Sequence, residues 1–349
     1  MKRQSMVDYG QPLQETVADT PEPHGSEVII RVSHCGVCHS DIHMHDGYFE
    51  LGGGRQLDVR SGRELPFTLG HEIAGEVAAA GPDAAGVAVG EHYAVYPWIG
   101  CGECSLCVRG DEHLCNTANH LGITVDGGYA SHVVVPHPRY LLSTEGLEPT
   151  LAGSYMCSGL TAYSALKKVA ANVPDGPLMI VGLGGVGMMG LQFAKALYDT
   201  EIFACDIDPA KREAALKAGA SQVFDPAEDG IRKTVLKATG GGAAAAVDYV
   251  GAENTLNFAQ SILRKNGAVV VAGLLGGTFS MPVPMFPLRA LSVIGTFVGS
   301  LNEAREMLDL VRAGKVDPIP VELRPLDQAN ASLDDLRGGH VLGRIVLTP

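Results

Sequence analysis

Cysteine residues form the densest group of reactive side chains in this chain. The run CGECSLCVRGDEHLC holds four of them at the spacing C-x2-C-x2-C-x7-C: Cys101, Cys104, Cys107 and Cys115. Four thiolates at about 2.3 Å from the metal form the ligand set of a closed, tetrahedral zinc site. Glycines at positions 100, 102 and 110 supply the tight turns of such a lobe. The spacing predicts a structural Zn²⁺ site in a lobe over residues 97–116.

The same four cysteines could instead form two disulfide bonds. The 349-residue chain shows no secretory leader, however, and a chain that stays in the cytoplasm keeps its thiols reduced. We therefore expect zinc rather than disulfides at this lobe, and a cytoplasmic location for the protein.

A second group of metal-ligand residues is scattered along the chain. Cys38 lies in HCGVCHSDIH, His71 in PFTLGHEIAG and Cys157 in SYMCSGLTAY, each at the end of an apolar stretch. Two thiolates and one imidazole leave a fourth zinc position open, and the metal lowers the pKa of a hydroxyl bound there. The three residues are therefore predicted to hold a catalytic zinc. Cys35 and Cys205 are expected to be buried filler.

A glycine-rich loop follows the apolar run LMIV. The segment VGLGGVGMMG, residues 181–190, fits the pattern G-x-G-x-x-G. In that pattern the missing side chains permit the turn, the approach of a pyrophosphate and close packing of the following helix. The loop is predicted to bind a dinucleotide through five residues: Gly182, Gly184, Gly185, Val186 and Gly187.

An acidic residue ends the next predicted strand, EIFACD. Asp206 stands about twenty residues after the glycine loop, where a carboxylate can accept hydrogen bonds from both ribose hydroxyls. It would also repel a 2′-phosphate, so NAD is expected rather than NADP. The alternative is that Asp206 is a solvated strand end with no such role.

Taken together, these motifs resemble the zinc-dependent alcohol dehydrogenases of the medium-chain dehydrogenase/reductase family. The resemblance runs from EVIIRVSHCGVCHSDIH through GHEIAGEV, the cysteine lobe and GLGGVG to HVLGRIVL, which is nearly the whole chain. It implies an α/β fold, with a mainly β, GroES-like catalytic domain and a Rossmann domain built on a doubly wound parallel sheet. It also implies two zinc ions per chain and NAD.

The resemblance assigns roles to further residues. Ser40 and His43 match the family's proton relay, and Asp41 and Glu72 match carboxylates that orient a ligating imidazole and tune the metal's charge. The remaining matches are to cofactor contacts: His39 and Arg344 at the pyrophosphate and Lys211 near the adenosine ribose.

The implied reaction is reversible hydride transfer between a primary or secondary alcohol and NAD⁺, giving an aldehyde or ketone and NADH. Ser40 would pass the proton through a ribose hydroxyl to His43, whose near-neutral pKa suits a shuttle to solvent. An alternative of another class is a catalytically inactive zinc- and NAD-binding scaffold or sensor. A third is the zinc-free reductase branch, which would not need the scattered ligands. The substrate stays open, because one methylene changes discrimination by only about 1–3 kcal/mol.

The order of the predicted elements divides the chain into two domains. Residues 1–160 mix short strands with Gly/Pro turns, whereas 161–296 alternate strand and helix. The segment 297–349 is expected to return to the first domain at VLGRIVL. The active site is expected in the cleft between the domains. Helices are predicted over residues 210–220, 252–265 and 302–315. The last strand of the second domain is predicted over residues 292–299.

Composition excludes two classes of partner. The formal net charge is −13 at pH 7, which argues against nucleic acid as the ligand of the cysteine lobe. No run of 18 apolar residues occurs, so no membrane span is expected. The expected partners are a small alcohol, aldehyde or ketone, and further copies of the chain in a homodimer or homotetramer.

The spacer 46–66 departs from the family pattern. It is longer than expected and rich in Gly and Arg, so it is either a mobile flap near the pocket or a tolerated surface insertion. Four histidines near the zinc motifs have no family role: His34, His45, His92 and His113. Three apolar or aromatic residues are expected either in the substrate pocket or in the core: Tyr48, Trp98 and Leu274.

Overall fold

A six-stranded parallel sheet forms the middle of the chain. The computed structural model describes residues 1–349, and the strand order in this sheet is β13-β12-β11-β14-β15-β16. Its strands are β11 (Leu178–Val181), β12 (Ile202–Cys205), β13 (Gln222–Phe224), β14 (Ala243–Asp248), β15 (Leu263–Val271) and β16 (Ser292–Gly295). β11, β12 and β14 are buried throughout, as expected of parallel strands covered on both faces. From β11 the next strands are added first on one side of the sheet and then, from β14 on, on the other side. Such sheets bind ligands at the point where the strand order reverses.

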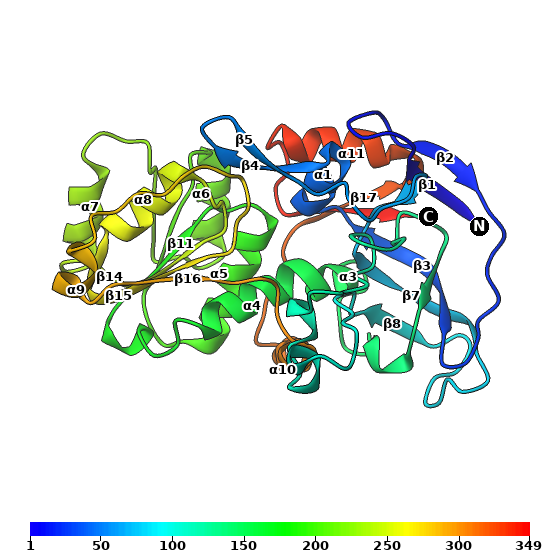
Figure 1. Cartoon of the computed structure of the whole chain (residues 1–349). Coiled ribbons are helices and arrows are strands. Elements are labelled where there is room, and N and C mark those ends of the chain that lie inside the picture. The colour runs from blue at the N-terminus through cyan, green and yellow to red at the C-terminus, as the bar shows by residue number, and fades with distance from the viewer.

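Helices connect the parallel strands. They are α5 (Gly185–Leu197), α6 (Pro209–Lys217), α7 (Ile231–Ala238), α8 (Glu253–Ser261) and α9 (Met285–Arg289). The helix predicted over 252–265 ends earlier, because Leu263 already pairs with Ala243 as the start of β15. The predicted strand over 292–299 is also shorter, since β16 ends at Gly295. Figure 1 shows this domain on the left of the molecule.

The second domain is built on a mostly antiparallel sheet, in which β17 and β18 form the one parallel pair and strands from both ends of the chain meet. Its path is β10-β8-β7-β3-β18-β17, and β9 also pairs with β3. The strands are β3 (Val28–Gly36), β7 (Glu72–Ala80), β8 (His92–Val95), β9 (His132–Val135), β10 (Leu141–Ser143), β17 (Val321–Pro325) and β18 (Arg344–Thr348). β18 pairs with β3 through Val346 opposite Gly36. The C-terminal segment therefore completes the N-terminal sheet, while the domain limits at 160 and 297 stay predictions.

Smaller elements cover this sheet. A three-stranded sheet consists of β1 (Lys2–Met6), β2 (Gln14–Val17) and β6 (Phe67–Thr68). The helices are α1 (His39–Asp46), α2 (Ser105–Val108), which lies in the cysteine lobe, and α11 (Ala329–Arg337). No helix is both long and apolar enough to cross a membrane.

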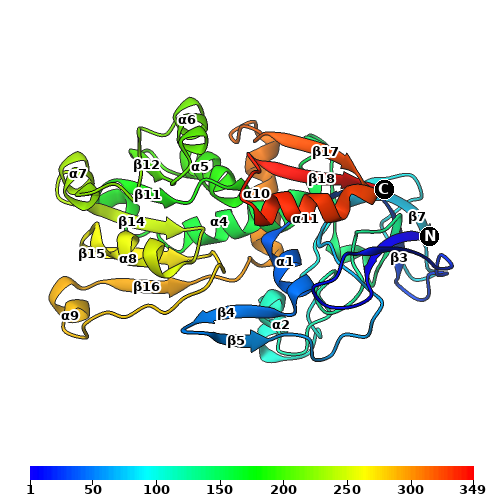
Figure 2. The same cartoon turned by 90° about the horizontal axis from the view of Figure 1, so that it is seen from above.

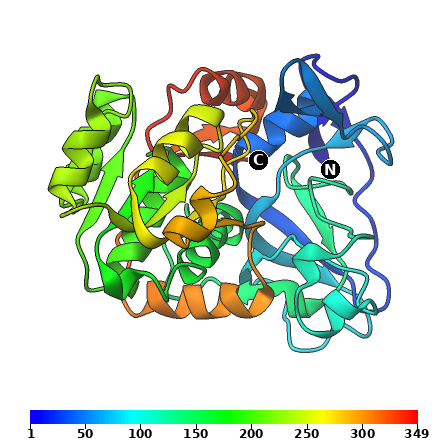
Figure 3. The ribbon, with the colours of Figure 1, turned by 60° about the vertical axis from the view of Figure 1, so that its left-hand side comes forward.

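Two helical segments join the domains. The first contains α3 (Ala152–Ser154), a π-helical turn over Tyr155–Gly159 and α4 (Leu160–Lys167). The second is α10 (Leu301–Arg312), which begins at a capping box between Ser300 and Glu303. Figure 3 shows α10 in orange along the lower edge, spanning the junction. The larger hydrophobic core continues through these helices from one sheet to the other, so the domains share packed side chains.

The spacer 46–66 contains a β-hairpin that crosses to the other domain. Its strands are β4 (Tyr48–Gly52) and β5 (Arg55–Asp58), and Figure 2 shows them extending towards the domain that contains the parallel sheet. The hydroxyl of Thr278 donates a hydrogen bond to the carbonyl of Leu51 at 3.2 Å. A Cβ atom on Gly276 would lie 2.5 Å from the carbonyl oxygen of Glu50. The insertion is therefore an ordered bridge between the domains.

Candidate active site

Three distant segments bring one thiol, one imidazole and a second thiol together. Cys38 is the N-cap residue of α1, His71 precedes β7, and Cys157 lies in the π-helical turn. Their ligand atoms all lie within 4.8 Å of one another, and all three side chains are buried. The scattered trio predicted from the sequence is thus a single cluster, placed where a π-turn interrupts a helix.

The chemistry of this cluster fits a zinc ion. The Nε2 atom of His71 is buried and has no hydrogen-bond partner, although its other ring nitrogen is used. A buried nitrogen without a partner is costly unless a ligand takes its lone pair. Two thiols and this nitrogen are the donors that zinc prefers, and three protein ligands leave a position for substrate.

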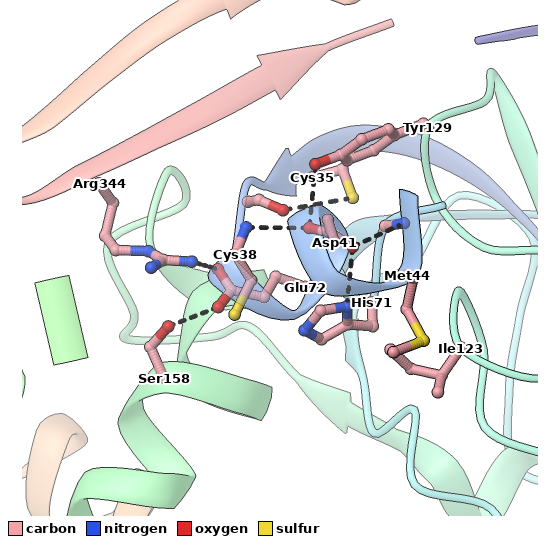
Figure 4. Close-up of polar contacts among 12 residues, drawn as sticks. Cys35, Cys38, Asp41, Met44, His71, Glu72, Ile123, Tyr129, Ser158 and Arg344 are labelled. Carbon is pink, nitrogen blue, oxygen red and sulfur yellow. Dashed lines mark hydrogen bonds and ion pairs between the residues drawn. The ribbon is translucent and has the colours of Figure 1, made fainter. Parts of the chain in front are cut away.

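Asp41 holds the histidine in place. Its Oδ1 accepts hydrogen bonds from Nδ1 of His71 at 3.1 Å and from the backbone N–H of Gly70 at 3.2 Å. Its Oδ2 accepts from the backbone N–H of Cys38 at 2.9 Å and from the hydroxyl of Tyr129 at 3.0 Å. Figure 4 shows this carboxylate between the two ligands. Asp41 therefore fixes the tautomer of His71 and leaves Nε2 free for the metal.

The protonation states of the two thiols and the imidazole depend on one another. The hydrogen bond with Cys157 lowers the pKa of Cys38 well below its usual value, whereas the same bond and burial raise the pKa of Cys157 well above it. Burial alone would lower the pKa of His71, but the charge and hydrogen bond of Asp41 raise it well above 6.5. Two buried thiols in contact cannot both ionise unless a cation neutralises them.

Glu72 links the cluster to the C-terminal strand. Its carboxylate, fully buried, forms an ion pair with Arg344 at 2.5 Å and accepts a hydrogen bond from Ser158. Burial raises the pKa of Glu72, and the positive charge of Arg344 opposes that rise. A Cβ atom on Gly36 would lie 2.0 Å from this carboxylate, so position 36 requires glycine. The resemblance implied a pyrophosphate contact for Arg344, and in the structure its guanidinium faces Glu72.

The four cysteines of the lobe also converge. Their sulfur atoms all lie within 4.8 Å of one another, with Cys104 and Cys107 at 3.5 Å, and all four cysteines are free. The backbone N–H groups of Cys104 and Cys101 point at the sulfurs of Cys101 and Cys115 at 3.4 Å. Hydrogen bonds from Cys101 and Thr117 lower the pKa of Cys115 to about 6. Four converging thiols that share hydrogen bonds from backbone N–H groups fit a closed zinc site.

The glycine loop has the geometry of a phosphate cradle. Gly182 turns the chain with φ +86°, and a Cβ atom on Gly187 would lie 1.8 Å from the carbonyl oxygen of Gly182. Around Gly184 nothing lies within 4 Å of an added Cβ atom, so this side of the loop is open to a ligand. Gly185 and Val186 begin α5, whose N–H groups face the same opening. A Cβ on Gly185 would meet the side chain of Arg344 at 2.4 Å, which places the loop next to the metal cluster.

Asp206 sits beside this loop. Its carboxylate accepts hydrogen bonds from the backbone N–H groups of Leu183 at 2.7 Å and Asp208 at 2.9 Å. The guanidinium of Arg212, a residue that sequence reasoning missed, binds the backbone carbonyl of Asp206 at 2.7 Å. Lys211 donates to the carbonyl of Gly339 at 3.1 Å, so it reaches from α6 to the other domain. The contacts of Asp206 and Lys211 with a ribose stay predictions.

The residues of the predicted relay lie on α1. Ser40 and His43 are three positions apart, so they share one face of the helix, and both are half-buried. The ring of His43 lies 4.5 Å from that of Phe49 in the hairpin. Burial lowers the pKa of His43 below 6.5. His39, the first residue of α1, is exposed.

Trp98 belongs to the larger hydrophobic core and also lies next to His71, so the structure is compatible with both of its sequence interpretations. It is buried, its ring centroid is 5.5 Å from that of His71, and its indole N–H donates to the carbonyl of Met156 at 2.8 Å. Tyr48 is half-buried at a polar surface hollow and Leu274 is 46% exposed, so neither belongs to the core. Cys35 and Cys205 are buried in the two cores, as expected of filler.

The unassigned histidines have varied surroundings. His45 contacts the carbonyl of Gln11 at 2.7 Å, His34 contacts Ser33, and His92 is exposed beside Glu76. His113 has a buried Nδ1 without a partner. Sequence reasoning missed four residues that surround the metal cluster: Tyr129, Ser158, His120 and Phe297. Ser158 carried a signal, since it follows Cys157 directly, whereas the others are brought in only by the fold.

Comparison with known proteins agrees with this geometry. Residues 24–145 match the model of the alcohol dehydrogenase GroES-like domain, and residues 185–313 match the model of the zinc-binding dehydrogenases. The chain is 37% identical over 351 residues to an NAD-dependent alcohol dehydrogenase of Sulfurisphaera tokodaii, with all of both chains covered. It is 37% identical over 355 residues to one of Saccharolobus solfataricus, again with full coverage.

Solved structures show the same fold. An alcohol dehydrogenase from Aeropyrum pernix superimposes with a TM-score of 0.90 at 29% identity, covering all of both chains. The fold and site define a two-domain, zinc-binding dehydrogenase with a Rossmann and a GroES-like domain. The chain belongs to the zinc-dependent alcohol dehydrogenases of the medium-chain dehydrogenase/reductase family.

Proposed function

We propose that this protein is an NAD- and zinc-dependent dehydrogenase that interconverts primary or secondary alcohols with aldehydes or ketones. The observation that best supports this proposal is the cluster of Cys38, His71 and Cys157. The two thiols and the unpartnered Nε2 atom of His71 lie close to the glycine loop. Glu72 and Arg344 connect the two sites, because Arg344 pairs with Glu72 and packs on Gly185.

The two cofactors would be held by residues already described. The three-residue cluster would hold one zinc ion, which polarises the substrate oxygen when bound, and the lobe cysteines would hold a second, structural one. The glycine loop and Asp206 would hold NAD, which accepts the hydride. Asp41 keeps His71 oriented through its hydrogen bonds, and burial of the cluster excludes competing water.

The proton would leave along α1. Ser40 would accept it from the substrate hydroxyl and transfer it to a ribose hydroxyl and then to His43. The half-buried position of His43 at the hairpin gives it access both to the site and to solvent. Because burial lowers its pKa, His43 stays neutral, and so able to accept a proton, at neutral pH.

One experiment tests the function directly. Purified protein is analysed for zinc per chain, and NAD reduction is followed with ethanol, propan-2-ol, longer primary and secondary alcohols and benzyl alcohol. Two zinc ions and turnover of an alcohol are expected. Two zinc ions and tight NAD binding without turnover of any alcohol would favour the inactive scaffold, and turnover without zinc would favour the zinc-free branch.

We also infer a homodimer or homotetramer located in the cytoplasm. The location is supported by the free cysteines, because a reducing compartment preserves thiols. An assembly is supported by the edge strand β16, which leaves one side without a partner strand, and by exposed apolar side chains near it. Val283 is 77% exposed and Leu288 is 69% exposed.

A further inference from the structure

Three rings form a wall beside the metal cluster. This aromatic wall consists of Trp98, His120 and Phe297, from three separate segments of the chain. The ring centroid of Trp98 lies 5.5 Å from His71, 5.2 Å from His120 and 5.5 Å from Phe297. The rings of His120 and Phe297 are stacked at 6.2 Å. Trp98 therefore lies against the proposed zinc ligand His71, and His120 and Phe297 both pack against Trp98.

His120 is the polar member of this wall with an unused nitrogen. Its side chain is buried, only 7% of the residue is exposed, and Nε2 has no hydrogen-bond partner. The indole N–H of Trp98 is already bound to Met156, and Phe297 has no polar atom. Leaving a buried nitrogen unpaired costs about 1–3 kcal/mol. A partner that arrives with the substrate would remove that cost.

The backbone fixes the position of this histidine. The carbonyl of His120 accepts hydrogen bonds from the N–H groups of Ile123, Thr124 and Val125 at 3.2, 2.9 and 3.2 Å. The ring is therefore carried by a tight turn rather than by a mobile loop. Burial, and then the neighbouring His113 and His71, lower the pKa of His120 to about 4, so the ring is neutral at neutral pH. A neutral imidazole has one nitrogen that donates and one that accepts.

We propose that His120 determines specificity by hydrogen-bonding a second oxygen of the substrate, beyond the reacting carbon. A hydroxyl group matches best, because it can donate to one imidazole nitrogen or accept from the other. The preferred substrates are then diols or other alcohols with a neighbouring hydroxyl or carbonyl group, rather than simple alkanols. This inference rests on the proposed dehydrogenase function and names its substrate class.

The test compares two substrates of equal shape. Butane-1,3-diol and pentan-2-ol differ in one terminal group, a hydroxyl against a methyl. We expect the parent enzyme to prefer the diol, and His120→Phe, which keeps an aromatic ring, to lower kcat/KM for the diol about tenfold, the value of one hydrogen bond. For pentan-2-ol, kcat/KM should be unchanged or higher. His120→Gln, which keeps a donor and an acceptor, should retain part of the preference.

A second readout does not depend on turnover. The chain has a single tryptophan, and Trp98 contacts His120, so intrinsic fluorescence reports binding at the aromatic wall. Titration with each alcohol in the absence of NAD⁺, so that no hydride acceptor is present, should show the diol preference in the parent and its loss in His120→Phe. An equal diol-to-alkanol ratio in the parent and both variants, by kinetics and by fluorescence, would overturn the role of His120. Failure of the parent to oxidise either alcohol, with the diol preference in binding intact, would instead contradict only the proposed dehydrogenase function.

Discussion

At the scale of single residues, the two proposed zinc sites differ in the number of protein ligands. The cluster with His71 leaves one coordination position open for substrate, whereas the four lobe cysteines leave none. Cys157→Ala should remove metal only from the cluster with His71. The variant should stay folded but lose alcohol turnover by several orders of magnitude, because no other group there can stabilise the developing negative charge. Cys104→Ala should first lower the thermal unfolding midpoint, since metal binding at a closed site is coupled to folding.

Metal analysis and calorimetry of both variants check this contrast. Cys205→Ala is a matched control, because Cys205 is equally buried but lies in the nucleotide-binding sheet, away from both groups. The prediction is wrong if active parent protein contains one zinc ion or none, or if Cys157→Ala and Cys104→Ala change metal content and stability in the same way.

We expect the choice between NAD and NADP to depend on Asp206. Asp206→Asn should lower kcat/KM for NAD on the order of tenfold, corresponding to ~1.5 kcal/mol for a charged hydrogen bond, and should raise the relative rate with NADP. Arg212 lies next to Asp206, so removal of the carboxylate would expose a 2′-phosphate to a positive charge. Parallel kinetics with both cofactors measure the ratio. Equal kcat/KM for NAD and NADP in the parent would refute this reading of Asp206.

The pH dependence of turnover should reveal His43. Because burial lowers its pKa, His43 can accept a proton at pH values where an exposed histidine is already protonated. His43→Ala should therefore slow alcohol oxidation most between that lowered pKa and about pH 7, where hydroxide is scarce. Zinc content should be unchanged, and added imidazole should restore part of the rate.

The exposed His92 supplies the matched control, since His92→Ala should leave the profile of kcat against pH as it is in the parent. If the profile of His43→Ala runs parallel to that of the parent while its NAD binding is weaker, His43 only packs against the cofactor and water releases the proton.

The site residues that could be predicted from the sequence are mainly those that lie close together along the chain. The four lobe cysteines and Gly182, Gly184 and Gly187 act within short segments, so their spacing alone predicted their geometry. Cys38, His71 and Cys157 are far apart in sequence, so their residue types suggested a zinc site and the family resemblance supported it, but no local spacing showed that they meet. His120 and Tyr129 gave no local signal, because their importance arises from tertiary contacts with Trp98 and Asp41.

At the scale of elements, we expect the contact between the β4–β5 hairpin and the other domain to influence both stability and substrate binding. Gly276 has φ +116°, and its Cβ would meet the carbonyl of Glu50 at 2.5 Å. Gly276→Ala should displace the hairpin and lower the free energy of unfolding by about 1–3 kcal/mol, with an altered KM for the alcohol. Thermal unfolding and kinetics measure both effects.

Gly54→Ala is the control for backbone strain, because Gly54 also has a positive φ but nothing lies within 4 Å of its added Cβ. Equal effects of the two substitutions on KM would mean that the contact with Glu50 has no influence on the site.

The same hairpin shows how element prediction fails and succeeds. The length of the spacer 46–66 signalled an insertion, but only the glycines at 52, 53 and 54, each with positive φ, show why it turns back into paired strands. Strands such as LMIV were predicted correctly because they are apolar throughout. The helix over 252–265 was predicted too long because ILRK is apolar and basic like a helix end, while Leu263 pairs in the sheet.

At the scale of the whole molecule, the edge strand β16 is the surface most suited to a second copy of the chain. The free edge of such a strand can pair with the same edge of a partner's strand across a two-fold axis. Light scattering with size-exclusion chromatography should find a dimer or tetramer of the 36.6 kDa chain. Val293→Lys, on β16, should shift it towards monomer, whereas Val89→Lys, also at an exposed valine, should not. A monomeric parent would contradict the assembly.

The pairing of β18 with β3 has a consequence for how the protein is made. Residues 344–348 leave the ribosome long after β3, yet Val346 must pair with Gly36 and Arg344 must neutralise the buried Glu72. The parallel sheet between β11 and β16 is continuous in sequence and can fold during synthesis, whereas the sheet that contains β3 has to wait for β18. Until β18 has been made, the thiols of Cys38 and Cys157 are therefore part of an unfinished domain, open to oxidation and to whichever metal the cell offers first.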